Sequence, residues 1–287
     1  MASRRYDTGL GVADRSSGGP DRGGARRSRV IVLKTPEQVE RMRAAGRVVR
    51  DVLEFVKSIC VPGQTTREID ERAAQRIASH GAEGLFKGYR QPGTEPFPAN
   101  LCLSVNEVVV HGIGNDRPLC EGDIVGADCG VRLKGWCGDA ATTVMVGRVA
   151  PRVGRLCEVT RHLLDIAVAN MRPGRRWSQI ARLMQRYAEG SGLSVVRKFV
   201  GHGVGVDLHE DPQVPNYVDE QTLQADFELV EGMVLAVEPM CNLGVADTTV
   251  DPVDGWTVRT ADGEPSAHYE HTIAITAKGA DVLTDGR

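Results

Sequence analysis

The chain has 287 residues, of which 41% are hydrophobic and 25% charged, as is ordinary for a globular protein with a sizeable core. Its net charge of −3 gives no reason to expect a general nucleic-acid-binding protein. No apolar run approaches the roughly 20 residues of a membrane-spanning helix, and no apolar stretch follows the basic N-terminus as in a secretory signal. The seven cysteines include no Cys-x-x-Cys pair, which argues against a disulfide framework and favours a reducing, cytoplasmic compartment.

Residues 1–29 are predicted to form a disordered tail before a single folded domain over residues 30–287. The tail contains seven Arg, three Asp and six Gly, and almost nothing that could be buried. We interpret it as a solvated leader. The alternative is a basic arm that touches an acidic partner such as ribosomal RNA.

Two helices are expected at the start of the folded domain. Thr35, Pro36 and Gln38 form a helix-start pattern: a capping Thr, a Pro at the first helical position and a Gln three residues after the cap. Apolar residues follow at helical spacing until the Pro-Gly pair at 62–63 ends the helix. A second helix follows and extends to about residue 81.

This layout of helix, Pro-Gly turn, helix and Gly recurs at an offset of 111 residues. Pro62-Gly63 matches Pro173-Gly174, and Gly81 matches Gly192. Two further matches at the same offset are Leu53 with Leu164 and Ile69 with Ile180. A repeat of this length predicts two similar halves rather than a solenoid of short units.

Strand-like segments follow each helical pair, at 101–110, 123–132 and 136–146 in the first half and at 195–200, 233–239 and 268–275 in the second. Helices and strands therefore segregate within each half, which is typical of an α+β fold. If the two halves place their sheets side by side, a cleft is expected at the join.

Two aspartates flank a predicted hairpin turn around residues 133–135. Asp128 and Asp139 are about equally far from the turn, which places them roughly opposite each other on one face. Carboxylates in that arrangement repel each other, and a bound cation would remove the repulsion. A pair of solvated hairpin carboxylates is the alternative, but the apolar neighbours of both residues favour a buried sheet.

Three more candidate ligands come from the second half. His202 is presented by a glycine-lined loop at 201–205, Glu238 stands at the end of an apolar strand, and Glu270 stands inside another strand. A carboxylate in an apolar strand is costly unless it is paired or bound to a metal. A structural salt bridge is therefore the alternative for Glu238.

Taken together, Asp128, Asp139, His202, Glu238 and Glu270 offer four carboxylates and one imidazole. These mostly hard oxygen ligands suit two divalent ions, such as Mn²⁺, Fe²⁺, Co²⁺ or Zn²⁺, better than a single structural zinc, which would favour thiolates. Two ions that share carboxylate bridges can hold a water between them as a nucleophile.

About residues 30 to 285 resemble the type I methionine aminopeptidases. The matching motifs are the two Asp segments, Ser-Val-Asn-Glu-Val-Val-Val-His-Gly at 104–112, Gly-His-Gly-Val-Gly at 201–205, His-Glu-Asp-Pro at 209–212, Glu-Pro-Met at 238–240, Asp-Gly-Trp-Thr-Val at 254–258 and Ser-Ala-His-Tyr-Glu-His-Thr at 266–272. The resemblance implies the α+β pita-bread fold, with two pseudo-symmetric halves around a central dinuclear metal cleft. It implies a cytoplasmic, monomeric metallo-exopeptidase that removes the initiator methionine from nascent polypeptides when the second residue is small.

The resemblance also assigns roles to the candidate ligands. Asp128 is expected to chelate one ion, Asp139 and Glu270 to bridge both ions, and His202 and Glu238 to complete the other. Glu238 is further expected to shuttle the proton of the bridging water.

Two histidines and a pocket are implied in the same way. His111 is expected beside the scissile amide, and His209 is expected to hydrogen-bond the substrate and polarise its carbonyl. A strand-end histidine with satisfied hydrogen bonds is the alternative for either residue alone. The methionine pocket is expected at Cys102, Trp256, Leu208 and either Tyr89 or Phe97, and a monovalent cation at Asn106, Val108 and Ser266.

The sequence departs from the family at three places around this pocket. Leu208 stands where an aromatic residue is common, Gly130 stands where Thr is common, and residues 89–102 form a longer, proline-rich stretch. These departures concern the shape of the methionine pocket and leave the five metal ligands in place.

Three rival interpretations are weighed against this one. In proline-specific relatives the two glutamates are much closer than Glu238 and Glu270, and an extra N-terminal domain precedes the first motif helix. Type II methionine aminopeptidases carry a long insertion between the second histidine and the glutamate, for which the span from His209 to Glu238 is too short. A non-catalytic binding protein on the same fold would be expected to lack metal ligands, and all five are present.

Overall fold

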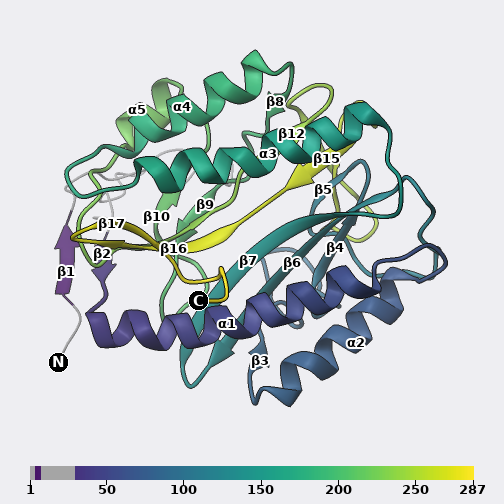
Figure 1. Cartoon of the computed structure of the whole chain (residues 1–287), viewed down its shortest axis with the longest axis horizontal. Helices are drawn as coiled ribbons and strands as arrows, with labels where there is room; N and C mark the ends of the chain where they lie inside the picture. Colours follow the sequence, from purple (N-terminus) through teal and green to yellow (C-terminus); the bar gives the residue numbers. More distant parts are fainter. Residues whose placement is uncertain (1–3, 8–29) are drawn as a thin grey trace.

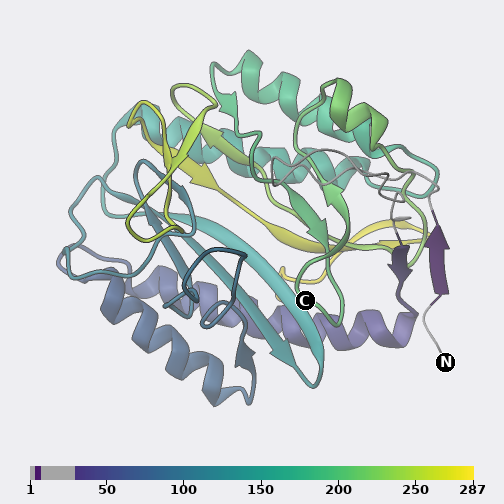
Figure 2. The ribbon, with the colours of Figure 1, turned by 180° about the vertical axis from the view of Figure 1, so that it is seen from behind.

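Two helical pairs cover the strands of the protein from opposite sides (Figure 1). In this computed structural model, which describes residues 4–7 and 30–287, the first pair is α1 (Pro36–Ile59) and α2 (Thr66–Ser79). The second pair is α3 (Pro151–Asn170) and α4 (Trp177–Gly190), and the short α5 (Glu220–Gln224) follows later. The view from behind shows the same layering (Figure 2). None of the described helices combines the length and the hydropathy that a bilayer crossing demands.

The predicted tail is described only over four residues. Arg4–Asp7 form β1, which pairs antiparallel with β2 (Val30–Leu33) at the start of the main body. A strand therefore stands at these four residues in place of the expected disorder. Residues 1–3 and 8–29 lie outside the described residues, and disorder there stays a prediction.

The repeat of the helical unit is present in the structure. Helix α4 begins and ends 111 residues after α2, and β8 (Ser194–Val195) lies 111 residues after β3 (Glu83–Gly84). The two Pro-Gly turns also match, because Gly63 and Gly174 have φ values of 91° and 83°, which glycine adopts without strain. Each of these two glycines donates its N–H to a leucine carbonyl farther along its own half.

The first half builds its sheet around one long hairpin. Strands β6 (Ile124–Leu133) and β7 (Trp136–Met145) pair without a register shift over their whole length. The other edge of β6 pairs with β4 (Cys102–Val105) and with β3. The hairpin turn consists of Lys134 and Gly135, whose φ values of 50° and 83° are both positive, as in a two-residue type I′ turn.

The second half divides its strands between two sheets, with orders β10-β9-β11-β16-β17 and β15-β12-β8. Their bounds are β9 (Gly201–Gly203), β10 (Glu210–Val214), β11 (Val234–Val237), β12 (Met240–Asn242), β15 (Ser266–His268), β16 (His271–Thr276) and β17 (Gly279–Val282). A smaller sheet joins β5 (Val108–Val110) of the first half to β14 (Val258–Thr260) and β13 (Thr248–Val250).

Several strand predictions need correction. The segment predicted as one strand over 101–110 is divided into β4 and β5, because Asn106 between them has a left-handed φ of 52°. Of the segment at 195–200, only Val195 belongs to a strand. His202 lies on β9 rather than in a loop, and Glu270 lies in the break between β15 and β16 rather than inside a strand.

Each helical pair packs on the strands of its own half through buried apolar side chains. In the first half, Val52 of α1 and Ile69 of α2 share a core with Val125 of β6. In the second half, Met184 of α4 shares a core with Leu235 of β11. This separation of helical and strand layers within two similar halves confirms the predicted α+β organisation.

The two halves meet along β7 and β16. The Thr272 hydroxyl donates a hydrogen bond of 2.7 Å to the carbonyl oxygen of Asp139 and accepts one of 3.1 Å from the Asp139 N–H. The N–H of Glu270 donates to the carbonyl oxygen of Ala141 at 2.9 Å. Residues from both halves are therefore held together at the join, where the sequence predicted a cleft.

Candidate metal centre

A cleft of about 570 Å³ opens at the join of the two halves. All five predicted metal ligands line it: Asp128, Asp139, His202, Glu238 and Glu270. The predicted residues Cys102, Phe97, His111, His209, Leu208, Trp256 and Tyr89 line it as well. The cleft thus brings together nearly every site residue that the sequence proposed.

The first half contributes two aspartates from the β6–β7 hairpin. The two-residue turn sets a register in which Asp139 faces Gly130 and Asp128 faces Ala141. The prediction that the two aspartates lie opposite each other is therefore wrong by two residues. They are diagonal neighbours whose side chains project from the same face of the hairpin, so the expected meeting of the two carboxylates in one cleft still holds.

The second half contributes its ligands from a strand and two strand breaks. His202 stands on β9, where it pairs with Ala236 of β11 and Gln213 of β10. Glu238 follows the last residue of β11, and Glu270 precedes the first residue of β16. All three residues therefore lie on, or directly next to, three neighbouring strands of one sheet, β9, β11 and β16.

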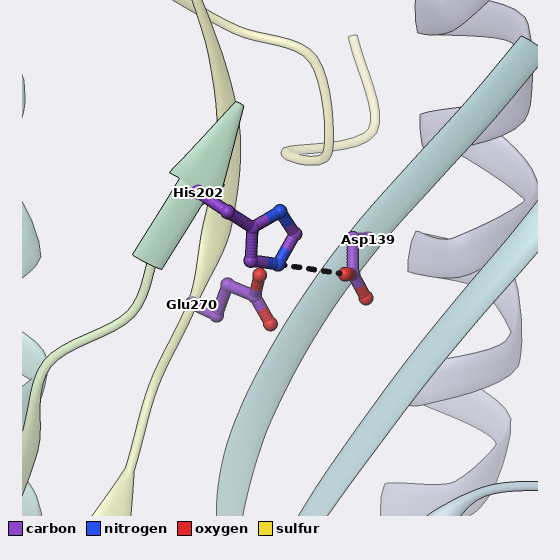
Figure 3. Close-up of side chains that lie close together, drawn as sticks. All are labelled: Asp139, His202 and Glu270. Atoms are coloured by element: carbon purple, nitrogen blue, oxygen red, sulfur yellow. Dashed lines mark ion pairs between the residues drawn. The ribbon is translucent and has the colours of Figure 1, made fainter. Parts of the chain in front are cut away.

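Three of the five residues form the tightest cluster. Asp139, His202 and Glu270 each offer one ligand atom, and these atoms all lie within 4.8 Å of one another. Figure 3 shows the three side chains converging across the join of the halves, with His202 Nε2 3.7 Å from Asp139 Oδ2. His202 Nε2 also lies 3.8 Å from Glu238 Oε1.

The carboxylates of this cluster are buried, and each is only partly satisfied by neighbouring groups. Asp139 and Glu270 are 3% and 2% exposed. One oxygen of each, and Oδ1 of Asp128, has no hydrogen-bond partner within the described part of the chain. Burial and the charges of the neighbouring carboxylates raise the pKa of Asp128, Asp139 and Glu270 well above the usual range.

Glu238 differs from the other three carboxylates. Burial by itself would raise its pKa, but the hydrogen bond from His268 and the neighbouring His202 hold the pKa below the usual range. His268 Nε2 lies 3.5 Å from Glu238 Oε2. Glu238 is therefore the carboxylate that the protein itself keeps ionised in this cleft.

A divalent cation would account for both the unpaired oxygens and the raised pKa values of these carboxylates. Unpaired buried carboxylates repel one another, and a cation bound among them supplies the missing partner and favours their ionised form. Carboxylate oxygens with one imidazole are donors that Mn²⁺, Fe²⁺, Co²⁺ and Zn²⁺ accept. The residues present therefore fit a divalent metal centre.

Two further histidines line the same cleft and are neutral near pH 7. Burial lowers the pKa of His111 and of His209 to about 4. The Tyr89 hydroxyl oxygen lies 3.2 Å from His209 Nδ1, and the ring of His111 contacts the rings of Phe199 and Trp256 edge-on. Both imidazoles thus stand beside the cluster as neutral hydrogen-bonding groups.

The sequence profile of metallopeptidase family M24 matches residues 40–277, which is most of the chain and includes all five candidate ligands. The chain belongs to this family. Metallopeptidases of this family use divalent metal, in agreement with the donor set in the cleft.

Individual members of this family are also similar to the chain. The chain is 44% identical over 255 residues to methionine aminopeptidase 1 of Bacillus subtilis, with 89% of this chain and 99% of that protein covered. It is 39% identical to the crystal structure of methionine aminopeptidase from Rickettsia prowazekii, which superposes with a TM-score of 0.83 over 88% of this chain and 99% of that chain. The prolidase of Pyrococcus furiosus shares only the pita-bread fold, at 20% identity and a TM-score of 0.68 over 89% of this chain and 66% of that chain.

One wall of the M24 cleft is lined by aromatic rings. Phe97 and Trp256 are buried and meet edge-to-face at 5.3 Å between ring centres. Tyr89 contacts Trp256 at 6.4 Å and His209 at 5.4 Å. The sequence left Tyr89 and Phe97 as alternatives for one wall, and the structure places both on the cleft. Leu208, in place of the common aromatic residue, is buried and also faces the cleft.

The departure at Gly130 has a local cause. A Cβ atom at this position would lie 2.7 Å from Cε1 of Phe86 and 3.3 Å from Oδ1 of Asp139. Phe86 lines the cleft and occupies the space that a larger residue at 130 would need. Glycine therefore lets an aromatic ring pack directly against the strand beside the metal cluster.

The sequence did not single out His268 or Phe199. His268 is 4% exposed, and its Thr143 neighbour bonds both its N–H and its carbonyl oxygen. Its position inside the 266–272 motif was the available signal, but its contact with Glu238 arises only when β15 and β12 pair. Phe199 precedes β9 and reaches the cleft beside His111.

The residues expected to hold a monovalent cation lie together but away from the cleft lining. The Ser266 N–H donates to the carbonyl oxygen of Asn106 at 2.9 Å, and the Asn106 side chain bonds Asp123 and the N–H of Ile124. Val108 begins the adjacent strand β5. None of the three lines the cleft.

Proposed function

We propose that the chain is a methionine aminopeptidase, which hydrolyses the first peptide bond of polypeptides that begin with methionine. The observation that carries the proposal is the convergence of five candidate ligands on one cleft, where three buried carboxylate oxygens have no hydrogen-bond partner in the described part of the chain, beside two neutral histidines. The methionine aminopeptidases of Bacillus subtilis and Rickettsia prowazekii, which match the chain over nearly their full lengths, support it.

Two divalent ions are proposed at the cluster. Asp128 would hold one ion, Asp139 and Glu270 would bridge the pair, and His202 and Glu238 would hold the other. When bound, such ions lower the pKa of water and act as Lewis acids toward the scissile carbonyl. Co, Mn, Fe and Zn all accept these donors, so the site chemistry leaves the physiological metal open.

Glu238 is proposed to accept the proton of the attacking water and to pass it to the departing amine. The surrounding histidines favour its ionised form, as a general base requires. His268 Nε2 lies 3.5 Å from Oε2 of that carboxylate, whereas His202 lies near Oε1, so the two histidines contact different oxygens.

The two neutral histidines are proposed to bind the reacting peptide bond. With the Tyr89 hydroxyl donating to His209 Nδ1, the other ring nitrogen of His209 carries a hydrogen that can bond the substrate carbonyl oxygen as it gains charge. His111 would bond the scissile amide from the wall formed by Phe199 and Trp256.

The methionine side chain is proposed to bind in the cleft against the wall formed by Phe97, Cys102, Trp256 and Leu208. A flexible, polarizable thioether suits contacts with ring edges and a thiol. The second residue would have to be small, because it lies where His111 and His209 approach the cluster. The remaining assignments are a monovalent cation at Asn106, Val108 and Ser266, and a monomeric enzyme that works on nascent chains in the cytoplasm.

A peptide assay with several metals tests the proposal. We expect release of methionine from Met-Ala-Ser in the presence of Mn²⁺, Co²⁺, Fe²⁺ or Zn²⁺, and much slower release from Met-Phe-Ser. Preference for Xaa-Pro peptides would favour a prolidase instead. Purification without divalent metal, and no hydrolysis of any peptide after metal is added, would favour a non-catalytic protein.

A further inference from the structure

A second concavity of about 170 Å³ lies beside the proposed active-site cleft. Helices α4 and α5 and the segment before α5 form its walls, with Trp177, Tyr217, Val218, Ala225 and Phe227 among the lining residues. Figure 1 shows α4 and α5 on the same side of the molecule as β9 and β10, which carry ligand and cleft residues. Among the described cavities this one shares residues with the cleft, since Val200 and Gln213 line both.

Gln213 lies between the active-site cleft and the second concavity and lines both. On β10 it is the direct register partner of His202 on β9, so both side chains project from the same face of the sheet. Neighbouring strands lie about 4.8 Å apart. Gln213 is exposed and therefore forms the lip over which a chain leaving the cleft can enter the second concavity.

Two polar groups of this concavity, the Trp177 indole N–H and the Asp226 carboxylate, already have hydrogen-bond partners inside the protein. Trp177 Nε1 donates to the Pro215 carbonyl oxygen at 2.8 Å. The Asp226 carboxylate accepts hydrogen bonds from Arg176 Nε at 2.7 Å and from the Ser178 N–H and hydroxyl at 2.9 and 2.7 Å. The rings of Trp177, Tyr217 and Phe227 and several aliphatic residues make up much of the lining, so the concavity suits an apolar side chain.

Two exposed cations flank the path between the two spaces. The Arg197 guanidinium stacks over the ring of Tyr217 at 5.6 Å, and the Lys198 ammonium lies 6.0 Å from the ring of Phe199. Tyr217 lines the concavity and Phe199 lines the cleft. Each of the two spaces therefore has an aromatic lining residue with an exposed cation beside it.

We propose that this concavity is a subsite for the substrate polypeptide and binds an apolar side chain of a residue beyond the scissile bond, because Val200 and Gln213 line both spaces. The proposal rests on the proposed function, because a long substrate must leave the cleft across the adjoining surface. Leucine or an aromatic residue at that position fits the walls better than glycine.

The test compares heptapeptides that differ at one position. Met-Ala-Ser-Gly-Gly-Gly-Gly is the reference, and leucine replaces glycine in turn at positions 4, 5 and 6. We expect one leucine peptide to show a kcat/KM about fivefold to tenfold higher than the reference, as partial burial of one apolar side chain allows. The gain should appear in KM and leave kcat unchanged, since the contact lies far from the reacting bond.

Two variants of α5 provide a matched pair. Ala225 lines the concavity, and Ala225→Trp would fill it. Leu223 stands in α5, two residues before the C-cap residue Ala225; it is 46% exposed and does not line the concavity, so Leu223→Trp adds a similar bulk outside it. We expect Ala225→Trp to abolish the leucine gain and Leu223→Trp to keep it, both with reference-peptide kinetics like those of wild type. Tyr217→Ala removes a wall without adding bulk and should also abolish the gain.

The outcomes separate this proposal from the proposed function. Equal kcat/KM for all heptapeptides in the wild-type enzyme would overturn the subsite alone. The same holds for a leucine gain that survives in both Ala225→Trp and Tyr217→Ala. Failure to release methionine from any of the peptides would overturn the proposed function, and the subsite with it.

Discussion

The two halves of the molecule have a similar order of helices and strands, but their strands differ at the carboxylates that reach the cleft. In the first half, β6 runs without interruption through Asp128, and β7 runs through Asp139. In the second half, β11 stops just before Glu238 and is followed by Pro239, while β15 and β16 are separated at Tyr269 and Glu270. Strand β11 begins 110 residues after β6, so Asp128 and Glu238 occupy the same place, five residues into each segment.

The breaks of the second half connect it to the first half. Proline has no N–H to continue a strand ladder, so the chain turns at Pro239. The Tyr269 N–H donates to the Pro239 carbonyl oxygen at 3.3 Å, and the Glu270 N–H donates to Ala141 of β7 at 2.9 Å. A rigid hairpin on one side and two interrupted strands on the other therefore meet, and all four carboxylates reach one cleft.

The imidazoles are also unevenly divided. His202, His209 and His268 come from the second half, and His111 alone comes from the first. Each half thus supplies two carboxylates to the cleft, and the second half supplies three of the four imidazoles. The predictions below probe this division, beginning with the residues at the join.

The largest effect is expected at the two carboxylates closest to the join. Asp139→Asn or Glu270→Gln should abolish peptide hydrolysis and lower metal content, because each is proposed to bridge both ions. Tripeptide hydrolysis and elemental analysis of the purified variants provide the measurement. Leu223→Trp, outside the cleft, is the matched control. Wild-type turnover in either variant at ordinary metal concentration would contradict the dinuclear assignment.

Replacing a second-half histidine that is not a proposed ligand should separate catalysis from metal binding. His209→Ala is expected to lower kcat by about 10²–10³, which is typical for loss of one hydrogen bond to the developing oxyanion. Metal content should stay at the wild-type level. A parallel loss of metal and activity would make His209 a ligand and contradict its assigned role. Tyr89→Phe should give a smaller loss, because it removes only the partner of His209 Nδ1.

The stability of the join should depend on pH through His271. Burial lowers the pKa of His271 to about 4, so the unfolded chain binds its proton more readily than the folded protein does. Folded-state stability should therefore fall as the pH drops from about 6.5 toward 4, by about 1.4 kcal/mol per pH unit for one such group. Urea unfolding of wild type and His271→Gln over this range should show a shallower pH dependence in the variant. An identical slope in both proteins would exclude His271 as a contributor.

The smallest effects are expected at the helix starts, where the two halves again differ. Helix α2 is capped by its own Thr65, which accepts from the Glu68 N–H, whereas the start of α4 is held by Asp226 from 48 residues away. Thr65→Ala should cost about 1 kcal/mol. Asp226→Ala should cost about 2 kcal/mol or more, because it leaves the half-buried N–H and hydroxyl of Ser178 without their acceptor and removes the partner of Arg176. Urea unfolding gives both values, and equal losses would contradict this difference.

The parts of the fold that depend on local chemistry were predictable from the sequence. The capping box at Thr35 and Gln38 starts α1 as expected, and the Pro-Gly turns mark the repeat that the structure contains. The repeat also continues into the strands, since Glu121-Gly122 and Glu231-Gly232 precede β6 and β11 at an offset of 110. That one-residue change of offset is why the match at 111 residues did not reveal that Asp128 and Glu238 are equivalent.

The features that depend on distant contacts were not predictable in the same way. The two-residue turn at Lys134 and Gly135 pairs Leu133 with Trp136, and this register places Asp128 two residues away from the position opposite Asp139. The contacts of His268 with Glu238 and of Tyr89 with His209 join segments 30 and 120 residues apart. Spacing along the chain carries no direct information about such pairs.

The most direct test of the central claim is the number of divalent ions that the cleft holds when the enzyme is active. Mn²⁺ titration of metal-free protein, followed by equilibrium dialysis and parallel assay of Met-Ala-Ser hydrolysis, measures both quantities on one sample. The account predicts that activity rises until two ions are bound per chain and that Asp139→Asn reaches neither the stoichiometry nor the rate. Full activity with one ion per chain, or hydrolysis that persists after all divalent metal is removed, would contradict it.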